Sequence, residues 1–399
     1  MRRSLRQYLT VTGTYWGFTL SDGALRILVL FHFFTLGYSP FTLALLFLMY
    51  EVVGIMANLG GGWLATRFGI PRMLLLGLAM QIMGLIFLSC LDPTFGPVFT
   101  VIWVVVAQGI AGLAKDITKT ASKSAIKVIK IDEGEGLFRW VAMFTGSKNA
   151  MKGAGFFLGG VMLTTIGFRS GLWLMAGLLG LLAVLVVFAL PPKLGAGVSS
   201  RTIKKLFSKS SAVNTIALAR FFLFGARDTW FVVALPVYLY ANDWSFWEVG
   251  GFLALWTVLY GLVQGMAPAI MRISTATPVS WTSAVGWAVA LALASIGILG
   301  CMIVKMDVPV LITGLLVFGV FFAVNSSLHS FLIVAYAGSK KAAEDIGFYY
   351  AANAAGRLVG TFLSGFLYYQ GGLLACLAGS ILFLVITVLM VTRLPQLEI

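Results

Sequence analysis

The sequence predicts an all-helical membrane protein of twelve spans, arranged as two six-helix halves around a central cavity. Three observations lead to this class. Of the 399 residues, 60% are hydrophobic and only 11% are charged, apolar runs recur along the chain, and the second half repeats the first. Each run is long enough to cross roughly 30 Å of hydrocarbon as a helix. The pattern of alternating strands of a membrane barrel does not occur.

Polar breaks divide the chain into the twelve spans. We expect them at residues 10–36, 41–65, 72–91, 97–122, 137–164, 170–190, 212–240, 247–271, 280–304, 309–335, 346–368 and 371–392. The longest hydrophilic connection, 191–211, is predicted to be a cytoplasmic linker. It separates an N-terminal six-helix bundle, 1–190, from a C-terminal one, 212–399.

Lys and Arg in the connections predict the orientation. Seventeen of them fall on one side of the membrane, and only Arg169 and Lys305 fall on the other. Both termini are therefore expected in the cytoplasm. The basic N-terminus is followed by no small-residue cleavage site, which favours a retained first helix over a signal peptide. The three cysteines are far apart and predict neither a metal site nor any cofactor.

The two halves match at a constant offset, which predicts two parallel repeats related by an axis along the membrane normal. A shift of 205 residues places Gly155–Gly160 on Gly360–Gly365 and Lys152 on Arg357. A shift of 206 places Asp22 on Asp228.

Charged residues inside the spans point to function, because a cation in hydrocarbon costs several kcal/mol and persists only beside a cavity, partner or ligand. The spans contain eight such cations and only four acids. This excess of four positive charges favours an anionic ligand. The cations are Arg26, Lys115, Lys119, Lys148, Lys152, Arg220, Arg227 and Arg357, and the acids are Asp22, Glu51, Asp116 and Asp228.

Neutralisation within the protein is the alternative. Local spacing can pair Asp22 with Arg26 and Asp116 with Lys119, and Arg227 adjoins Asp228. Such pairs leave Lys115, Lys148, Lys152, Arg220 and Arg357 without an acid. For Lys123 and Lys127 a solvated face or anionic lipid is favoured over substrate contact. Arg220 fits a structural or a functional role equally.

Two groups of motifs resemble known families. Residues Gly62–Arg72 resemble the cytoplasmic loop signature of the major facilitator superfamily, with Thr66 in place of its acid. The segments Ser21–Arg26, Ala114–Ala125 and Thr145–Gly153 resemble the organoarsenical efflux permease family, ArsJ. The resemblance extends over nearly the whole chain. This resemblance implies a secondary active exporter of 1-arseno-3-phosphoglycerate in a bacterial inner membrane, conferring arsenate resistance and linked functionally to glyceraldehyde-3-phosphate dehydrogenase.

The hypothesis assigns each candidate residue a role in alternating access with proton coupling. Substrate binding is assigned to Arg26, Lys115, Lys119, Lys148, Lys152, Arg227 and Arg357, with neutral hydrogen bonds from Asn149, Asn325 and His329, and proton coupling to Asp22, Glu51 and Asp228. The rival transport function is organophosphate:phosphate antiport. No catalytic residue, metal or nucleic-acid partner is predicted, and we expect a monomer in the lipid bilayer. A non-transporting sensor would need a sizeable soluble domain, and no loop exceeds about 20 residues.

Overall fold

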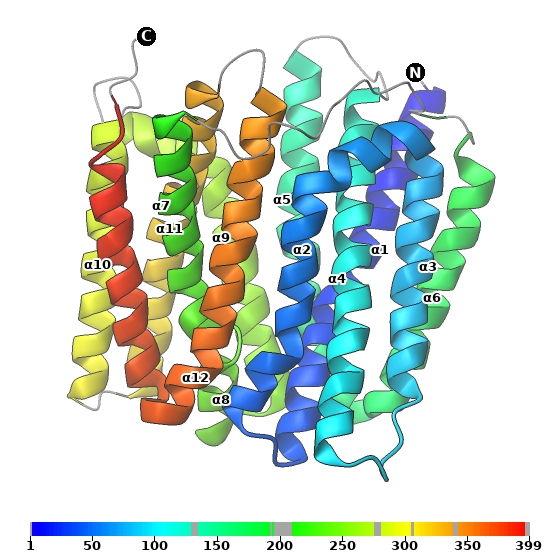
Figure 1. Cartoon of the computed structure of the whole chain (residues 1–399), viewed down its shortest axis with the longest axis horizontal. Helices are drawn as coiled ribbons and strands as arrows, with labels where there is room; N and C mark the ends of the chain where they lie inside the picture. The colour runs from blue at the N-terminus through cyan, green and yellow to red at the C-terminus, as the bar shows by residue number, and fades with distance from the viewer. Residues whose placement is uncertain are drawn as a thin grey trace. The chain divides into compact units, whose positions relative to one another are not determined.

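In the computed structural model every regular element within the described ranges is an α-helix (Figure 1). The backbone is described for residues 2–128, 135–191, 194, 210–274, 281–304, 307–337 and 342–395. Within these ranges, side chains are not described at 2–4, 58–68, 123–124, 126–128, 135–146, 268, 272–274, 281 and 342–344. Most of the predicted linker, the side chains of Lys123 and Lys127, and most side chains of the Gly62–Arg72 motif therefore lie outside the described residues.

Each predicted span is helical. The first six helices are α1 (Arg2–Thr35), α2 (Pro40–Phe68), α3 (Ile70–Ser89), α4 (Pro97–Val128), α5 (Glu135–Thr165) and α6 (Phe168–Ala189). The remaining six are α7 (Ser211–Phe231), α8 (Ala234–Ala241), α9 (Phe246–Ser274), α10 (Trp281–Ile303), α11 (Val308–Tyr336) and α12 (Ala342–Val391). Ten stretches of the described helices are long and apolar enough to cross a membrane.

The observed helices differ from the predicted spans at two places. The span predicted at 212–240 is broken, because α7 ends at Phe231 and α8 begins at Ala234. The hydroxyl of Ser364 accepts hydrogen bonds from the backbone N–H groups of Val233 (3.2 Å) and Ala234 (3.1 Å). This side chain satisfies donors that the break leaves without helical partners. The break therefore depends on a residue more than a hundred positions away.

The spans predicted at 346–368 and 371–392 follow each other without an intervening loop in α12. The backbone departs from helical geometry only at Gly371 and at Gly372, whose φ is 63°. That positive φ favours glycine, since other residues meet a steric penalty there. The two predicted spans are thus joined by a two-glycine kink.

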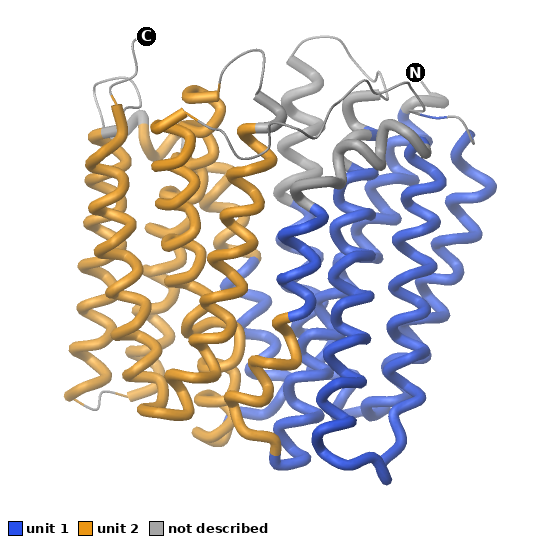
Figure 2. Tube along the Cα trace, in the orientation of Figure 1, with its two compact units in different colours: residues 1–37, 49–203, 244–257 blue, residues 38–48, 204–243, 258–399 orange. Residues whose placement is uncertain are grey.

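The helices form two compact units (Figure 2). Unit 1 contains residues 1–37, 49–203 and 244–257, and unit 2 contains residues 38–48, 204–243 and 258–399. In unit 1, α1 packs against α4, α5 and α6, and α3 against α4 and α6. In unit 2, α7 packs mainly against α12, and α10 against α11 and α12.

The same glycine contact recurs in both units and explains how the repeat is built. A β-carbon added to Gly155 of α5 would meet the carbonyl oxygen of Leu20 on α1. A β-carbon added to Gly360 of α12 would lie 2.6 Å from the carbonyl oxygen of Gly225 on α7. Both members of the second pair lie 205 residues after those of the first. The offset in the sequence therefore corresponds to one helix crossing formed twice.

Each unit also incorporates one helix end from the other half of the sequence. In unit 1, Gly160 approaches the backbone carbonyl of Phe246 at the start of α9. In unit 2, Gly365 approaches Phe41 at the start of α2, with 3.0 Å between the added β-carbon and the Phe41 Cα. These pairs are again 205 residues apart, so the exchange is reciprocal. The predicted bundles, 1–190 and 212–399, differ from the two units in this exchange, because residues 38–48 belong to unit 2 and residues 244–257 to unit 1.

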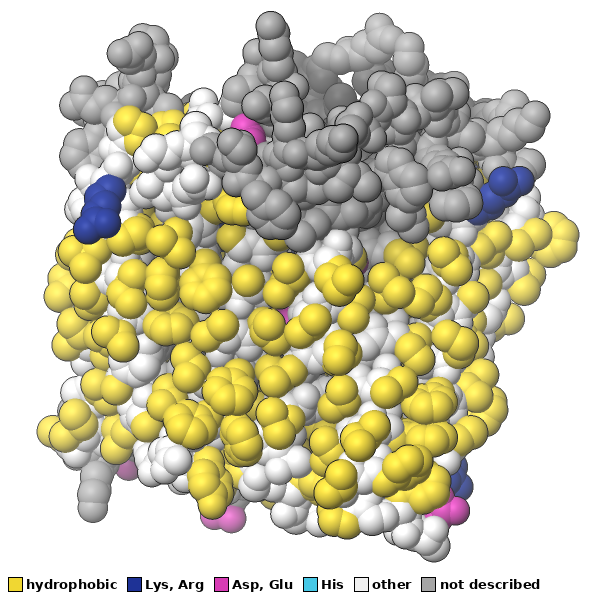
Figure 3. Space-filling model, viewed as in Figure 1, with side chains coloured by type: hydrophobic (Ala, Val, Ile, Leu, Met, Phe, Trp, Pro, Cys, Tyr) yellow, Lys and Arg dark blue, Asp and Glu magenta, His cyan; other side chains and the backbone are white. Residues whose placement is uncertain are grey.

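Hydrophobic side chains cover the sides of the described helices in each unit (Figure 3). Phe188 on α6 is 82% exposed and Leu181 is 68% exposed. On α10, Leu293 and Ile303 are exposed to a similar degree. Large apolar surfaces of this kind are stable in hydrocarbon and unfavourable in water. The chain is therefore a multi-pass membrane protein.

We predict that Gly155→Ala destabilises the protein, because the added methyl group would overlap the Leu20 carbonyl. Overpacking of this kind costs about 1 to 3 kcal/mol. Thermal unfolding of the purified protein checks this. The control is Gly177→Ala on α6, where no atom lies within 4 Å of the added β-carbon. Equal melting temperatures for the two variants would contradict the proposed crossing.

Candidate functional site

In unit 1, the carboxylate of Asp116 on α4 interacts with two lysines of the same helix. Asp116 is 2% exposed. Its Oδ1 accepts a hydrogen bond from the Lys119 Nζ at 2.6 Å, and its Oδ2 lies 3.7 Å from the Lys115 Nζ. Gly54 of α2 allows the Asp116 carboxylate to approach that helix closely, because a β-carbon added to Gly54 would lie 3.1 Å from the Asp116 Oδ2. One carboxylate thus partly neutralises two partly buried cations.

A second polar group of unit 1 links α1 to α2. The Nη2 of Arg26 donates to the Oε1 of Glu51 at 3.1 Å, and the hydroxyl of Tyr50 donates to the Oδ1 of Asp22 at 2.6 Å. Glu51 is 1% exposed. The pairing of Arg26 therefore differs from the local alternative, in which Asp22 was its partner. A carboxylate from another helix pairs with Arg26, and Asp22 accepts a neutral donor.

The ring of Tyr50 lies close to two cations. The Lys115 Nζ is 3.9 Å from the ring centre, and the Arg26 Cζ is 5.2 Å from it. An aromatic face attracts a cation more strongly when both are removed from water. Tyr50 therefore connects the Asp116 group to the Glu51 group, through its ring and its hydroxyl.

The remaining predicted residues of unit 1 lie on α5. Lys148, Asn149 and Lys152 are partly buried, and the Lys152 Nζ is 5.6 Å from the ring centre of Phe156. The Lys152 carbonyl lies at the α1–α5 crossing, 2.6 Å from a β-carbon added to Gly23. The backbone of Lys152 therefore lies against Gly23 of α1, the residue that follows Asp22.

In unit 2, one carboxylate is shared by two arginines. Asp228 of α7 is fully buried. Its Oδ1 accepts hydrogen bonds from Arg227, including one from Nε at 2.6 Å, and its Oδ2 accepts from the Arg357 Nε on α12 at 3.0 Å. Sequence spacing left Arg357 without an acid, and tertiary packing of α7 on α12 provides it. The three groups together retain one positive charge.

Arg220 lies two turns before Arg227 on α7 and has a different environment. It is 5% exposed. Its Nε donates to the Oδ1 of Asn353 at 2.9 Å, and its Nη1 donates to the backbone carbonyl of Ser326 at 2.9 Å. Its Cζ lies 3.9 Å from the ring centre of Phe224 and 5.2 Å from that of Tyr349. Within the described part of the chain, Arg220 has no carboxylate partner.

Asn325 and His329 are both fully buried on α11. The amide nitrogen of Asn325 donates to the carbonyls of Trp287 and Phe321, at 2.8 Å and 2.9 Å. Among the described residues, neither ring nitrogen of His329 has a hydrogen-bond partner. The amide nitrogen of Asn325 is thus engaged within unit 2, whereas both ring nitrogens of His329 lack a hydrogen-bond partner among the described residues.

The structure groups the predicted residues by unit. Arg26, Lys115 and Lys119 meet around Tyr50, while Arg227 and Arg357 meet at Asp228. The sequence analysis missed the neutral and aromatic partners, which are Tyr50, Phe224, Asn353 and Ser326. Phe224 could have been found from the sequence, because a ring four residues after an arginine lies on the same helix face.

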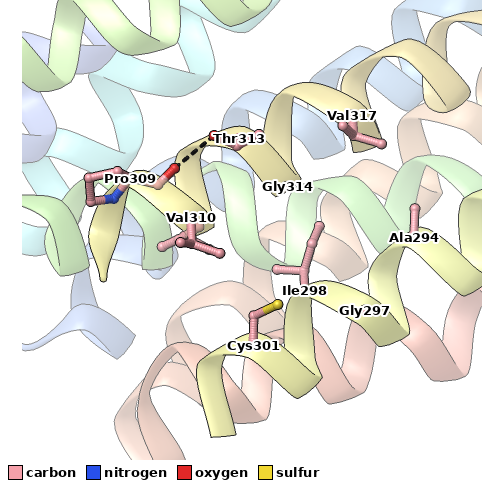
Figure 4. Close-up of a pocket in the computed structure, with 10 residues that line it drawn as sticks. Ala294, Gly297, Ile298, Cys301, Pro309, Val310, Thr313, Gly314 and Val317 are labelled. Carbon is pink, nitrogen blue, oxygen red and sulfur yellow. Dashed lines mark hydrogen bonds between the residues drawn. The ribbon is translucent and has the colours of Figure 1, made fainter. Parts of the chain in front are cut away.

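A pocket of about 430 Å³ lies between α10 and α11 in unit 2 (Figure 4). Its lining is apolar and includes Ile298, Cys301, Val310 and Val317. The hydroxyl of Thr313 points back to the Pro309 carbonyl at 2.9 Å. With no charged side chain in its lining, this pocket does not fit an anion.

Solved structures with the same fold are membrane transporters. A POT family transporter in complex with 5-aminolevulinic acid is 15% identical with a TM-score of 0.72, over 97% of this chain and 95% of that one. A peptide transporter POT mutant in complex with sulfate gives the same identity and score, over 97% and 94%. A mutant of the nucleoside transporter NupG is 12% identical with a TM-score of 0.70, over 98% of both chains.

No family model and no curated protein matches the sequence. At identities this low the comparisons establish the fold alone. The chain has the twelve-helix fold of the major facilitator transporters, as the span count and the repeat predicted.

We predict that Asp228→Asn strongly destabilises the protein, because it leaves two largely buried guanidinium groups without their fully buried carboxylate. Removing one member of a buried ion pair costs about 3 to 5 kcal/mol. The measurement is the melting temperature of the purified variant. Asp243→Asn is the matched control, since Asp243 is exposed and its φ of 66° suits asparagine. A variant at position 228 as stable as this control would refute the shared-carboxylate role.

Proposed function

We propose that the protein is a secondary active transporter that exports an anionic organoarsenical, 1-arseno-3-phosphoglycerate, across a bacterial inner membrane. The transporter works by alternating access and is coupled to protons. Its export confers resistance to arsenate, because the ester forms when glyceraldehyde-3-phosphate dehydrogenase uses arsenate in place of phosphate. Both termini are placed in the cytoplasm, following the loop charges.

The observation that carries the proposal is the excess of buried and partly buried cations within the spans of each unit. Unit 1 has five of the predicted lysines and arginines and three acids, Asp22, Glu51 and Asp116. Unit 2 has Arg220, Arg227 and Arg357, and the carboxylate of Asp228 contacts only the last two in the described structure. Charges that are not neutralised internally are costly in hydrocarbon. A bound anion offsets that cost.

The geometry of the basic groups fits acidic oxygens. A guanidinium presents a planar fork that matches phosphate, arsenate or carboxylate, while a lysine ammonium accepts several approach directions. Arg227 and Arg357 present such forks beside Asp228, and Lys115 and Lys119 present ammonium groups beside Asp116. Binding of the anion then replaces part of the carboxylate contact of each cation.

The carboxylates give a means of release. Glu51 and Asp228 already contact the cations assigned to the substrate, and Asp22 accepts from Tyr50 next to them. An ionised acid competes with a bound anion for the same arginine, whereas a protonated acid does not. Proton loss from such an acid therefore weakens binding of the anion, so that the proton and the anion are released on the same side of the membrane.

We predict that Lys152→Met and Arg357→Met each abolish export while the protein still folds. Methionine keeps much of the side-chain volume and removes the charge that binds the anion. The assay measures organoarsenical accumulation by inverted vesicles supplied with freshly formed ester. Arg169→Met is the control, because Arg169 is exposed, donates to the Leu91 carbonyl and lies outside the predicted site. Unchanged transport by either variant would remove that residue from the site.

The rival function, organophosphate:phosphate antiport, has one supporting observation, a buried arginine on α1 (Arg26) and another on α7 (Arg227). The two functions differ in what drives export. For the proton-coupled exporter we expect transport by reconstituted vesicles to respond to an imposed pH gradient and to be indifferent to phosphate on the opposite side. Stimulation by phosphate with no effect of pH would favour the antiporter.

A further inference from the structure

We infer that Arg220 and Arg227 form a two-point site, within unit 2 alone, for the two acidic ends of one anion. In this site the side-chain oxygen of Asn353 occupies the place that an acidic group takes when the anion binds. The inference rests on the proposed function for the identity of the anion and extends it to a residue outside the predicted site. The ligand class is a short organic molecule with an acidic group at each end.

The spacing of the two arginines is suitable for such a molecule. They are seven residues apart on α7, or about 10 Å along the helix and on almost the same face. The Arg220 Cζ is 3.9 Å from the ring centre of Phe224, and the Arg227 Cζ is 5.1 Å from the same point. The two guanidinium carbons are therefore separated by no more than the sum of these distances. That span matches a three-carbon chain with an acid at each end.

The partners of Arg220 indicate that an anion can replace one of them. A hydrogen bond between a charged donor and a charged acceptor is roughly twice as strong as one between neutral groups. Arg220 donates to two neutral acceptors, the Asn353 amide and the Ser326 carbonyl, and its other N–H groups have no acceptor among the described residues. A carboxylate or phosphate oxygen in place of the Asn353 oxygen strengthens the interaction.

A second observation near Arg220 supports a ligand. His329 is fully buried and follows Ser326, whose carbonyl accepts from Arg220, by three residues on α11. Neither of its ring nitrogens has a hydrogen-bond partner in the described structure. Buried polar atoms in native proteins are nearly always bonded. An acidic group at Arg220 provides an acceptor for the N–H of His329.

Displacement of Asn353 also has a structural consequence. The Arg220–Asn353 bond joins α7 to α12, the two helices that carry Arg227 and Arg357. Binding of an acidic end at Arg220 therefore removes one link between these helices. At the same time the other end contacts Arg227.

Asn353→Asp tests the site, because it places a permanent carboxylate 2.9 Å from the Arg220 Nε and leaves the side-chain shape unchanged. The purified full-length protein is titrated with 3-phosphoglycerate, which has two acidic ends, and with glycerol 3-phosphate, which has one. The readout is the concentration that gives half of the maximal thermal protection. For the wild-type protein we expect 3-phosphoglycerate to act at a concentration at least about tenfold lower, a difference of about 1.4 kcal/mol.

In Asn353→Asp we expect this preference to fall to about twofold or less, with no loss of thermal stability in the absence of ligand. Arg220→Gln removes the cation itself and should lose the preference in the same way. Asn242→Asp, an identical change at an exposed position after α8, should retain it. Preservation of the wild-type preference in Asn353→Asp, or its absence in the wild-type protein, would overturn the inference.

These outcomes separate the inference from the proposed function. If the wild-type protein does not export the organoarsenical but still prefers 3-phosphoglycerate, the proposed cargo is contradicted and the two-point site is not. Normal export by Asn353→Asp with an unchanged preference would contradict the two-point site alone.

Discussion

The energetic cost of a positive charge inside a membrane is the constraint on which this structure depends. The protein meets it within each unit. Asp116 interacts with Lys115 and Lys119 in unit 1, and Asp228 interacts with Arg227 and Arg357 in unit 2. In both cases one buried carboxylate serves two cations, so a positive charge remains. That remaining charge is stable only beside polar groups, aromatic rings or a bound anion.

Aromatic rings and neutral acceptors account for the rest of the compensation. Tyr50 lies beside Lys115 and Arg26, and Phe224 lies between Arg220 and Arg227. A ring face stabilises a cation without forming the strong, directional bond that a carboxylate forms. Cations compensated in this way are attracted to an entering anion more readily than cations in full ion pairs. The chemistry of each cluster is therefore compatible with reversible binding.

The repeated glycine contacts position these clusters. Gly155 and Gly360 bring α5 against α1 and α12 against α7, at equivalent places in the two units. The matched cations Lys152 and Arg357 each lie three residues before one of these glycines. Close backbone approach at the crossing thus holds each cation against the helix that carries Asp22 in unit 1 or Asp228 in unit 2. The same offset of 205 residues relates the helix ends exchanged between the halves.

The sequence by itself determined the membrane class, the number of spans, the repeat and the identity of the buried charges, because apolar run length and periodicity are local properties. It also indicated the Asp116–Lys119 pair, whose members lie on one helix face. Only the tertiary structure decided that Arg26 pairs with Glu51, that Arg357 shares Asp228, and that Ser364 caps the break before α8. Each of these contacts joins residues from different helices. Spacing along one helix cannot specify such partners, because they depend on how helices cross.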